Sequence, residues 1–170
     1  RFLFVGSVNR RKGIQHLFPA FERLDPNRSE LIIVGRYDDQ DKLIKKYRSL
    51  QNIKFMGFLT QDKVAELYRE SDVFVLPSLG EGLSQVSIEA MNSGLPIIVS
   101  DNTGVNDLIS EGVEGFIIPT SDREALYEKM KWFVENPMQV KLMGIKAHET
   151  AQKYTWEYYG LNAAEAIKEL

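Results

Sequence analysis

Six short apolar runs, separated by segments with helical spacing, constrain the fold of this chain more than any other feature. Most of the runs are continuously apolar rather than alternating, a pattern typical of strands buried on both faces of a parallel sheet. The alternation of strand and helix predicts an α/β fold, a Rossmann-like doubly wound parallel sheet of about six strands with right-handed crossovers. The runs are Phe2–Val5, Leu31–Val34, Ile53–Met56, Val73–Leu76, Ile97–Val99 and Phe116–Ile118.

Apolar stripes between the runs indicate the helices that would cover the sheet. The residues of the first stripe share one helical face. Pro19 lies inside the same segment and should kink or break that helix. The stripes are Ile14, Leu17, Phe18 and Phe21; Leu43, Ile44, Tyr47 and Leu50; and Val64, Leu67 and Tyr68. After Thr120 the strand pattern ends, and a C-terminal helical tail is predicted over Asp122–Glu135, Pro137–Tyr154 and Trp156–Leu170, with Ser121 or Asp122 as the first cap.

Composition excludes several classes of function. The net charge of −3 argues against a generic nucleic-acid binder, whose surface is usually basic. The chain has no cysteine, so it has no disulfide or thiolate metal site, which fits a reducing, cytoplasmic location. No apolar stretch reaches the roughly 20 residues needed to span a bilayer. The 170 residues suffice for one domain, and because they open inside a predicted strand, without methionine, we expect a domain of a longer protein.

The loop after the first predicted strand, GSVNRRKG (6–13), has the composition of a phosphate-binding turn. In a doubly wound sheet, ligands bind at the carboxyl ends of the strands, where this loop begins. Backbone donors at a helix start, together with Arg10, Arg11 and Lys12, suit a diphosphate. The spacing matches neither a P-loop nor a GxGxxG fingerprint, which disfavours a dinucleotide dehydrogenase. A solvated basic turn is the alternative interpretation.

The loop after the second strand, GRYDDQDK (35–42), contains three acids that could suggest a metal site. We interpret Asp38, Asp39 and Asp41 instead as a polar loop that caps the next helix, because no histidine nearby supports a ligand set. The two histidines, His16 and His148, fall in predicted helices and are interpreted as structural. No metal site is predicted.

The segment PSLGEGLSQVSIEAMNSGLP (77–96) combines a glycine loop with a predicted helix start. Ser84 is expected to cap a helix that ends near Ser93, with Gly94 as the C-terminal signal. The backbone amides near the helix start would favour an anion. These expectations make the segment a second candidate for phosphate binding.

Two glutamates flank that helix start. Glu81 lies at the mouth of the anion site, and Glu89, inside the helix, can lean back toward it. A carboxylate does not ligate phosphate, but it accepts hydrogen bonds from sugar hydroxyls. The pattern therefore suits a nucleotide sugar, while the alternative makes Glu81 a first-turn partner of the helix dipole and Glu89 an ordinary surface acid.

The two glutamates form an E-x7-E pattern that resembles the signature of the retaining glycosyltransferases that include sucrose synthases and bacterial mannosyltransferases, the glycosyl transferases group 1. Further stretches fall in that family's order, so the resemblance covers essentially the whole chain. They are FVGSVNRRKGIQHLFPAF, LIIVG, NIKFMGFLTQDKVAELYRESDVFVLPS, DLISEGVEGFIIP and YTWEYY. The resemblance implies one half of a GT-B enzyme, in which two Rossmann-like domains face each other across a cleft. Residues 1–170 would be the C-terminal, nucleotide-sugar-binding domain, and an N-terminal acceptor-binding domain would lie outside the chain.

The resemblance also implies roles for individual residues. Lys12 would meet the donor diphosphate, Glu81 the hydroxyls of the transferred sugar, and Glu89 the ribose. Lys12, Glu81 and Arg11 are thus the expected catalytic residues. The other expected donor-binding residues are Gly6, Ser7, Arg10, Phe58, Leu59, Gly82, Leu83, Ser84 and Gln85, with Phe58 and Leu59 at the edge of the base pocket.

Two positions depart from the family pattern. Many members carry Gly-Arg where this chain has Gly6-Ser7, and either Arg10 or Arg11 would supply the displaced cation. Ser84 replaces the second glycine of Glu-Gly-Phe-Gly, and its side chain would narrow the sugar subsite.

The implied function is retaining transfer of a sugar from a nucleoside diphosphate, UDP or GDP, to an acceptor hydroxyl, with no metal and no cofactor. The expected partners are the sugar nucleotide and, through the N-terminal domain, an acceptor glycan or lipid, but no nucleic acid. A position at the inner face of the membrane is left open, and the isolated domain is expected to be inactive. A sugar-nucleotide epimerase of the same architecture and a non-catalytic nucleotide-sugar-binding domain are the alternatives.

Overall fold

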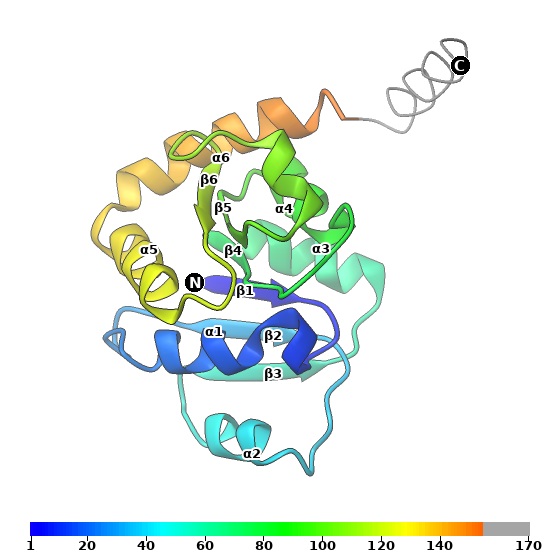
Figure 1. The fold of residues 1–170 in the computed structure, drawn as a ribbon, viewed down its shortest axis with the longest axis vertical. Coiled ribbons are helices and arrows are strands. Elements are labelled where there is room, and N and C mark those ends of the chain that lie inside the picture. Colours follow the sequence, from blue (N-terminus) through cyan, green and yellow to red (C-terminus); the bar gives the residue numbers. More distant parts are fainter. Residues whose placement is uncertain (155–170) are drawn as a thin grey trace.

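The computed structural model describes residues 1–154 and shows one parallel sheet flanked by helices (Figure 1). The strand order is β3-β2-β1-β4-β5-β6, and every neighbouring pair is parallel. The strands are β1 (Phe2–Val5), β2 (Leu31–Val34), β3 (Ile53–Gly57), β4 (Val73–Leu76), β5 (Ile97–Ser100) and β6 (Gly115–Ile118). Each predicted run coincides with a strand, and the predicted Rossmann-like α/β fold is confirmed.

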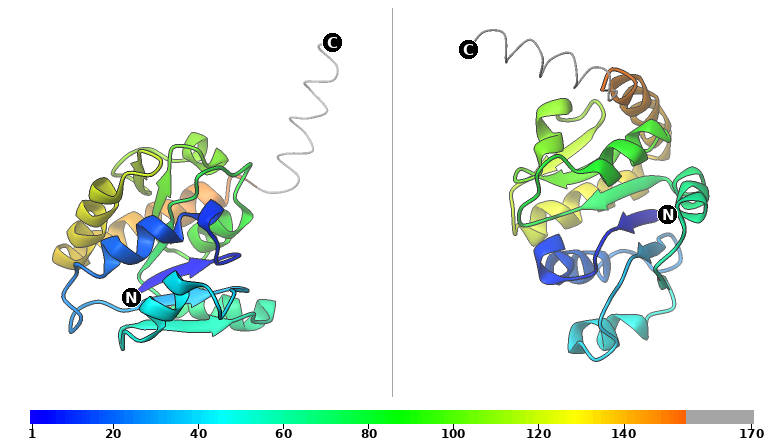
Figure 2. Two further views of the ribbon diagram at one scale, coloured as in Figure 1. Left: turned by 60° about the horizontal axis from the view of Figure 1, so that its bottom comes forward. Right: turned by 90° about the vertical axis from the view of Figure 1, so that its right-hand side faces the viewer.

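Helices cover both faces of this sheet. Helices α1 and α5 pack against each other on one face, and α4 packs against α6 on the other. The edge-on view in Figure 2 (right) shows the strands between α1 on one side and α3 on the other. The helices are α1 (Ile14–Phe21), α2 (Lys42–Arg48), α3 (Gln61–Glu70), α4 (Gln85–Asn92), α5 (Arg123–Glu135) and α6 (Pro137–Ala151), with short 3₁₀ turns η1 (Arg10–Lys12) and η2 (Gly104–Leu108).

Of the kink or break expected at Pro19, the break is wrong, because α1 continues through this residue to Phe21. The kink stays a prediction. A proline inside a helix removes one backbone hydrogen bond and costs about 3 kcal/mol. Leu17, Phe18 and Phe21 of the same helix are fully buried, and each such side chain contributes about 1.5–3 kcal/mol. Tertiary burial therefore outweighs the local cost.

The C-terminal helices follow the prediction in part. Asp122 caps α5 by accepting a hydrogen bond from the amide of Ala125, as one of the two expected caps. Helix α6 ends at Ala151 rather than at Tyr154. The helix predicted over Trp156–Leu170 lies outside the described residues.

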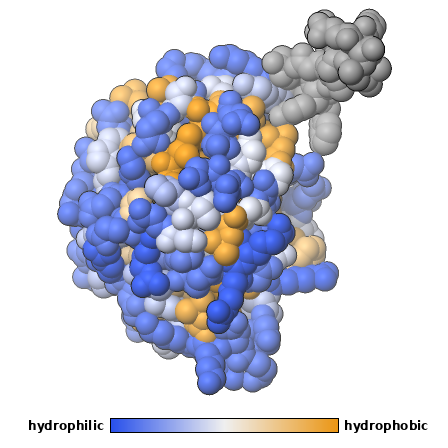
Figure 3. Space-filling view, viewed as in Figure 1, coloured by the Kyte–Doolittle hydropathy of each residue, from blue (hydrophilic) through white to orange (hydrophobic). Residues whose placement is uncertain are grey.

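The central strands form the middle of the core. All residues of β1, β2, β4 and β5 are buried, whereas the edge strand β3 exposes alternate side chains. On the face shown in Figure 3 the surface is largely hydrophilic, with small apolar patches. No helix within residues 1–154 combines the length and apolar character required to cross a membrane.

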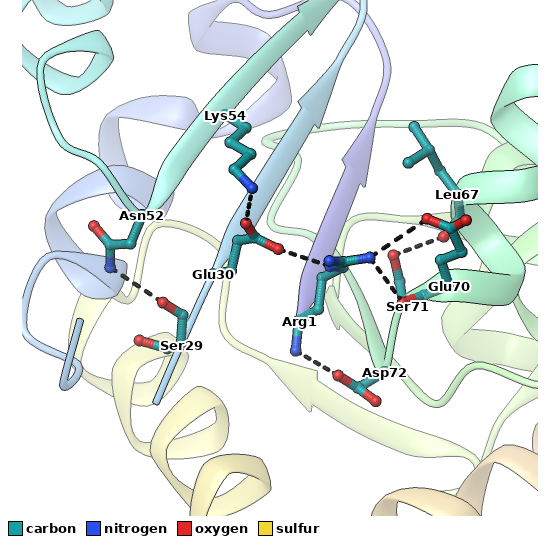
Figure 4. Close-up of polar contacts among 9 residues, drawn as sticks. All are labelled: Arg1, Ser29, Glu30, Asn52, Lys54, Leu67, Glu70, Ser71 and Asp72. Atoms are coloured by element: carbon teal, nitrogen blue, oxygen red, sulfur yellow. Dashed lines mark hydrogen bonds and ion pairs between the residues drawn. The ribbon is translucent and has the colours of Figure 1, made fainter. Parts of the chain in front are cut away.

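The amino ends of the strands are closed by a polar network (Figure 4). Glu30, at the start of β2, pairs with Arg1 and with Lys54 of β3. Burial raises the pKa of Glu30, but hydrogen bonds from Lys54 and Arg1 outweigh it and bring this pKa below its usual value. A hollow of about 820 Å³ lies at this edge, lined in part by these paired charges. Since ligands of doubly wound sheets bind at the opposite, carboxyl edge, the candidate site lies there instead.

Candidate functional site

Lys12 is held at the carboxyl edge by a compact turn after β1. The turn η1 is capped by Asn9, whose side-chain oxygen accepts a hydrogen bond from the Lys12 amide at 3.2 Å. Gly13 closes the turn with φ of 78°, and a Cβ added to it would lie 1.8 Å from the carbonyl oxygen of Pro77. Only glycine allows this approach, which brings the turn against the loop that follows β4.

The loop after β4 is fastened to the same turn by hydrogen bonds. The carbonyl of Arg11 accepts from the Leu79 amide at 2.8 Å and from the Ser78 hydroxyl at 3.0 Å. The two loops meet because β1 and β4 are neighbours in the sheet, with Phe2 opposite Val73. The strand order thus brings together residues that are distant along the chain.

Lys12 and Glu81 form an ion pair where the two loops meet. The Lys12 Nζ lies 2.6 Å from Glu81 Oε1, and the side chains are only 10% and 13% exposed. The same oxygen accepts from the Ser78 hydroxyl at 3.2 Å and lies 3.4 Å from the Arg11 guanidinium. The structure therefore brings the three expected catalytic residues together. Both Arg10 and Arg11 are exposed, and Arg11 is the one that contacts Glu81.

A pocket of about 400 Å³ lies beside this cluster, at the carboxyl ends of β1, β2 and β3. Four expected donor-binding residues line it, namely Gly6, Ser7, Phe58 and Leu59, together with Val5, Val34, Gly35, Arg36 and Val64. Phe58 is 71% exposed, and the Arg36 guanidinium lies 5.2 Å from the centre of its ring. An exposed aromatic ring beside a guanidinium is a surface on which a planar base can stack.

The lysine chain connects the pocket to the ion pair. A Cβ added to Gly6 would lie 3.6 Å from Cε of Lys12, so the aliphatic part of Lys12 runs over this glycine. Gly6 lines the pocket, while the Lys12 ammonium contacts Glu81. The apolar, aromatic pocket therefore lies next to two cations, Lys12 and Arg11, and the carboxylate of Glu81.

The Ser84 side chain was expected to narrow a sugar subsite, but it is buried in the structure; its effect on a sugar stays a prediction. The residue is 2% exposed, and its side-chain oxygen accepts a hydrogen bond from the Ser87 hydroxyl at 2.8 Å, so the hydroxyl is directed into the protein. Ser84 does occupy the N-cap position of α4, as predicted, but its side chain makes no capping hydrogen bond. The neighbouring Gly82, Leu83 and Gln85 are exposed at the start of the helix.

The loop after β5 supports the Glu81 loop. The Glu81 amide donates to the carbonyl of Asn102 at 2.9 Å, and the Gly104 amide donates to the carbonyl of Gly82 at 3.0 Å. The Asn102 side-chain amide donates to the carbonyl of Leu79 at 3.3 Å. A Cβ on Gly104 would lie 3.1 Å from the Gly82 oxygen, so the contact leaves little room.

Glu89 lies on α4 and is exposed. Its carboxylate contacts neither Lys12 nor Glu81 but accepts a hydrogen bond from the Tyr68 hydroxyl of α3 at 3.2 Å. Burial, and next the negative charge of Glu89, raise the pKa of Tyr68. The role of Glu89 toward a ligand stays a prediction.

The acids of the loop after β2 behave as the capping interpretation predicts. Asp41 accepts from the Leu43 amide at the start of α2, Asp38 accepts from the Gln40 amide, and Asp39 pairs with Arg48. Within residues 1–154 no three His, Asp or Glu side chains form a group suited to hold a metal ion.

Several residues at the site carried no recognised signal in the sequence. Arg36 follows β2 directly, a position where a basic residue could have been noticed, but the acids next to it drew the interpretation. Tyr68 was noticed only in an apolar stripe and in a stretch that resembles the family, whereas Asn102 and Gly104 belong to no motif. Only tertiary contacts connect the three residues to the site.

Comparison with solved structures shows that the fold of this chain recurs in other proteins. Sucrose-phosphate synthase from Thermosynechococcus elongatus superposes with a TM-score of 0.84 at 27% identity, covering 99% of this chain and 44% of that one. HepE of Anabaena in complex with UDP gives a TM-score of 0.85 at 22% identity, over 99% of this chain and 48% of that one. The matched regions are halves of GT-B glycosyltransferases. The fold predicted for this chain is the fold of those halves.

Comparison of sequences identifies the family. A sulfoquinovosyl transferase of Arabidopsis thaliana is 31% identical over 91% of this chain and 30% of its own length. A sucrose synthase of Acidithiobacillus caldus is 33% identical over 92% of this chain and 23% of its own length. The chain thus spans less than half the length of these relatives. The family model of the glycosyl transferases group 1 matches residues 1–154, and the chain belongs to that family.

Proposed function

We propose that this chain binds a nucleoside diphosphate sugar and serves a retaining glycosyltransferase as its donor-binding domain. The observation that carries the proposal is the contact of Lys12 with Glu81 beside the pocket lined by Gly6 and Phe58. The base would occupy the pocket, the diphosphate would meet Lys12 and Arg11, and the sugar would lie at Glu81. The order of apolar pocket, cations and carboxylate matches the order of groups in a nucleotide sugar.

The proposal draws support from a neighbouring structure. HepE of Anabaena has been solved with UDP and with UDP-glucose, and this chain shares its fold. At 22% identity the likeness supports the fold alone, so the assignment of the ligand rests on the side chains described above.

The residues of this chain would act by charge stabilisation. In the transfer, the bond between the anomeric carbon and the diphosphate oxygen breaks, and its electron pair stays on that oxygen. The acceptor hydroxyl forms the new bond to the anomeric carbon on the face that the diphosphate leaves, and its proton passes to the leaving diphosphate oxygen. Lys12 and Arg11 would stabilise the charge that grows on the diphosphate, and Glu81 would position the sugar. No general base and no nucleophile is assigned among these residues.

The other partners belong to the proposal as well. We expect a second domain, outside residues 1–170, to hold an acceptor glycan or lipid, and we expect no metal or cofactor to take part. The isolated chain should then bind the donor weakly and transfer no sugar.

Calorimetric titration of the chain with UDP, GDP and ADP and with UDP-glucose and GDP-mannose tests the proposal. At least one should bind, and Lys12→Ala should weaken that binding by roughly tenfold or more, the effect of losing one charged hydrogen bond. Lys146→Ala is the matched control, because Lys146 pairs with Glu149 at 2.7 Å on α6, away from the site. Absence of binding, or equal loss in both variants, would refute the proposal.

A further inference from the structure

We propose that Tyr68 is a positioning residue for the ribose of the donor and acts through Glu89, the residue that the family resemblance assigns to the ribose; this inference rests on that assignment and on the proposed function. Tyr68 belongs to α3, the helix whose Val64 lines the pocket proposed for the base. Its hydroxyl would fix the carboxylate of Glu89 in one orientation.

The Tyr68 hydroxyl shares its one hydrogen between two acceptors on α4. It lies 3.2 Å from Glu89 Oε2 and 3.2 Å from the carbonyl oxygen of Val86, one turn earlier in α4. The side chain is only 3% exposed, and its ring lies 6.2 Å from that of Phe74 in β4. A buried ring with this packing has little freedom, so the hydroxyl is a fixed reference point for α4.

Glu89 is the opposite case, an exposed side chain with one anchor. Among residues 1–154, Tyr68 is the one group that hydrogen-bonds its carboxylate, and the bond engages Oε2. No residue within 1–154 hydrogen-bonds the other oxygen, Oε1, and we expect it to accept a hydrogen bond from the ligand. Restraining a glutamate before binding removes part of the conformational entropy that binding would otherwise cost.

The protonation state suits this role. Burial and the nearby carboxylate both raise the pKa of Tyr68, so the phenol keeps its proton at neutral pH. The hydroxyl therefore donates and the ionised carboxylate accepts, and the acceptor capacity of Oε1 is left for a ribose hydroxyl.

The test compares a ribonucleotide with its deoxy form. The tightest binder among UDP, GDP and ADP is titrated into the chain beside its 2′-deoxy and 3′-deoxy counterparts. For the wild type, loss of the hydroxyl that meets Glu89 should weaken binding by about tenfold. Glu89→Ala should abolish that preference, and Tyr68→Phe should reduce it to about threefold or less, with the affinity for the deoxy form unchanged. In the Glu89→Ala background, Tyr68→Phe should have no further effect.

A matched control separates positioning from stability. Tyr47 is a buried residue of α2 and lies away from the site. Its hydroxyl donates to Glu22 at 2.8 Å. Tyr47→Phe removes the same kind of hydrogen bond and should leave the preference for the ribonucleotide intact. Thermal unfolding of each variant checks that it is folded.

The outcomes distinguish this inference from the proposed function. If the wild type binds none of the three nucleotides, or binds them independently of Lys12, the proposed function and the role of Tyr68 both fall. If binding depends on Lys12 but Tyr68→Phe weakens ribonucleotide and deoxyribonucleotide equally, or weakens neither, the role of Tyr68 alone is refuted. An unfolded Tyr68→Phe variant would also refute it, because Tyr68 would then serve the fold rather than the ribose.

Discussion

The ammonium group of Lys12 lies 2.6 Å from Oε1 of Glu81, and both side chains are largely buried. The cation expected to meet a diphosphate is therefore already neutralised by the acid expected to meet the sugar. A diphosphate that binds here has to share Lys12 with Glu81 or displace it.

Glu81→Gln should for this reason separate the two halves of the ligand. Removing the competing charge frees Lys12, so the affinity for the nucleoside diphosphate should rise by roughly three- to tenfold. The additional affinity contributed by the sugar should fall, because a carboxylate that accepts hydrogen bonds is lost. Titrating the variant with UDP and UDP-glucose, or GDP and GDP-mannose, gives both changes; a lower affinity for the diphosphate alone would contradict this prediction.

Gly104→Ala should disturb the sugar end of the site from a distance. Its Cβ would lie 3.1 Å from both the Gly82 oxygen and the Leu83 nitrogen, so the loop that carries Glu81 has to shift by a few tenths of an ångström. We expect about tenfold weaker binding of the sugar nucleotide and less than about twofold change for the nucleoside diphosphate. Asn106→Ala is the control, because its side chain bonds only the Asp101 carbonyl in the same loop; equal effects of the two substitutions would argue against the support proposed for Glu81.

Gly13→Ala should destabilise the fold. Both its φ of 78° and the 1.8 Å approach to the Pro77 oxygen oppose a side chain. Gly57→Ala isolates the first effect, because Gly57 has φ of 69° and a Cβ added to it would meet no atom of the described residues within 4 Å apart from its chain neighbours. Gly57→Ala should cost about 1 kcal/mol of unfolding free energy, and Gly13→Ala about 3 kcal/mol or more. Urea denaturation measures both, and similar losses would mean that the loops meet less tightly than described.

His16 should make the stability of the fold depend on pH. Burial, and next the charge of Arg123, lower the pKa of His16 below 6.5. As the pH falls below about 6.5, the unfolded chain takes up a proton that the folded chain still resists, so the unfolding free energy decreases. His16→Gln should lose this pH-dependent decrease in unfolding free energy. Urea denaturation of both proteins between pH 5 and 8 should give curves that diverge below pH 6.5, whereas parallel curves would exclude a contribution from His16.

Local pattern predicted the sheet well because continuous apolar runs such as Leu31–Val34 become central strands that are buried on both faces. The family motif implied that Lys12 and Glu81 belong to one site. The strand order that brings them together is known from the structure. The break expected at Pro19 does not occur because burial, rather than local preference, decides the helix, and burial also directs the Ser84 side chain into the protein. Tyr68 and Gly104 were missed because their significance lies in contacts between elements distant along the chain, which a single sequence does not display.

The adjacency of β1 and β4 has a consequence for how the protein assembles. A partly formed molecule in which only β1, β2 and β3 have associated would already possess the pocket near Phe58, yet it would have no partner for Lys12. Only arrival of the second half of the sheet supplies Glu81. A ligand that needs both features would thus bind the fully folded protein and not its partly folded precursors. Binding of such a ligand would report that folding is complete.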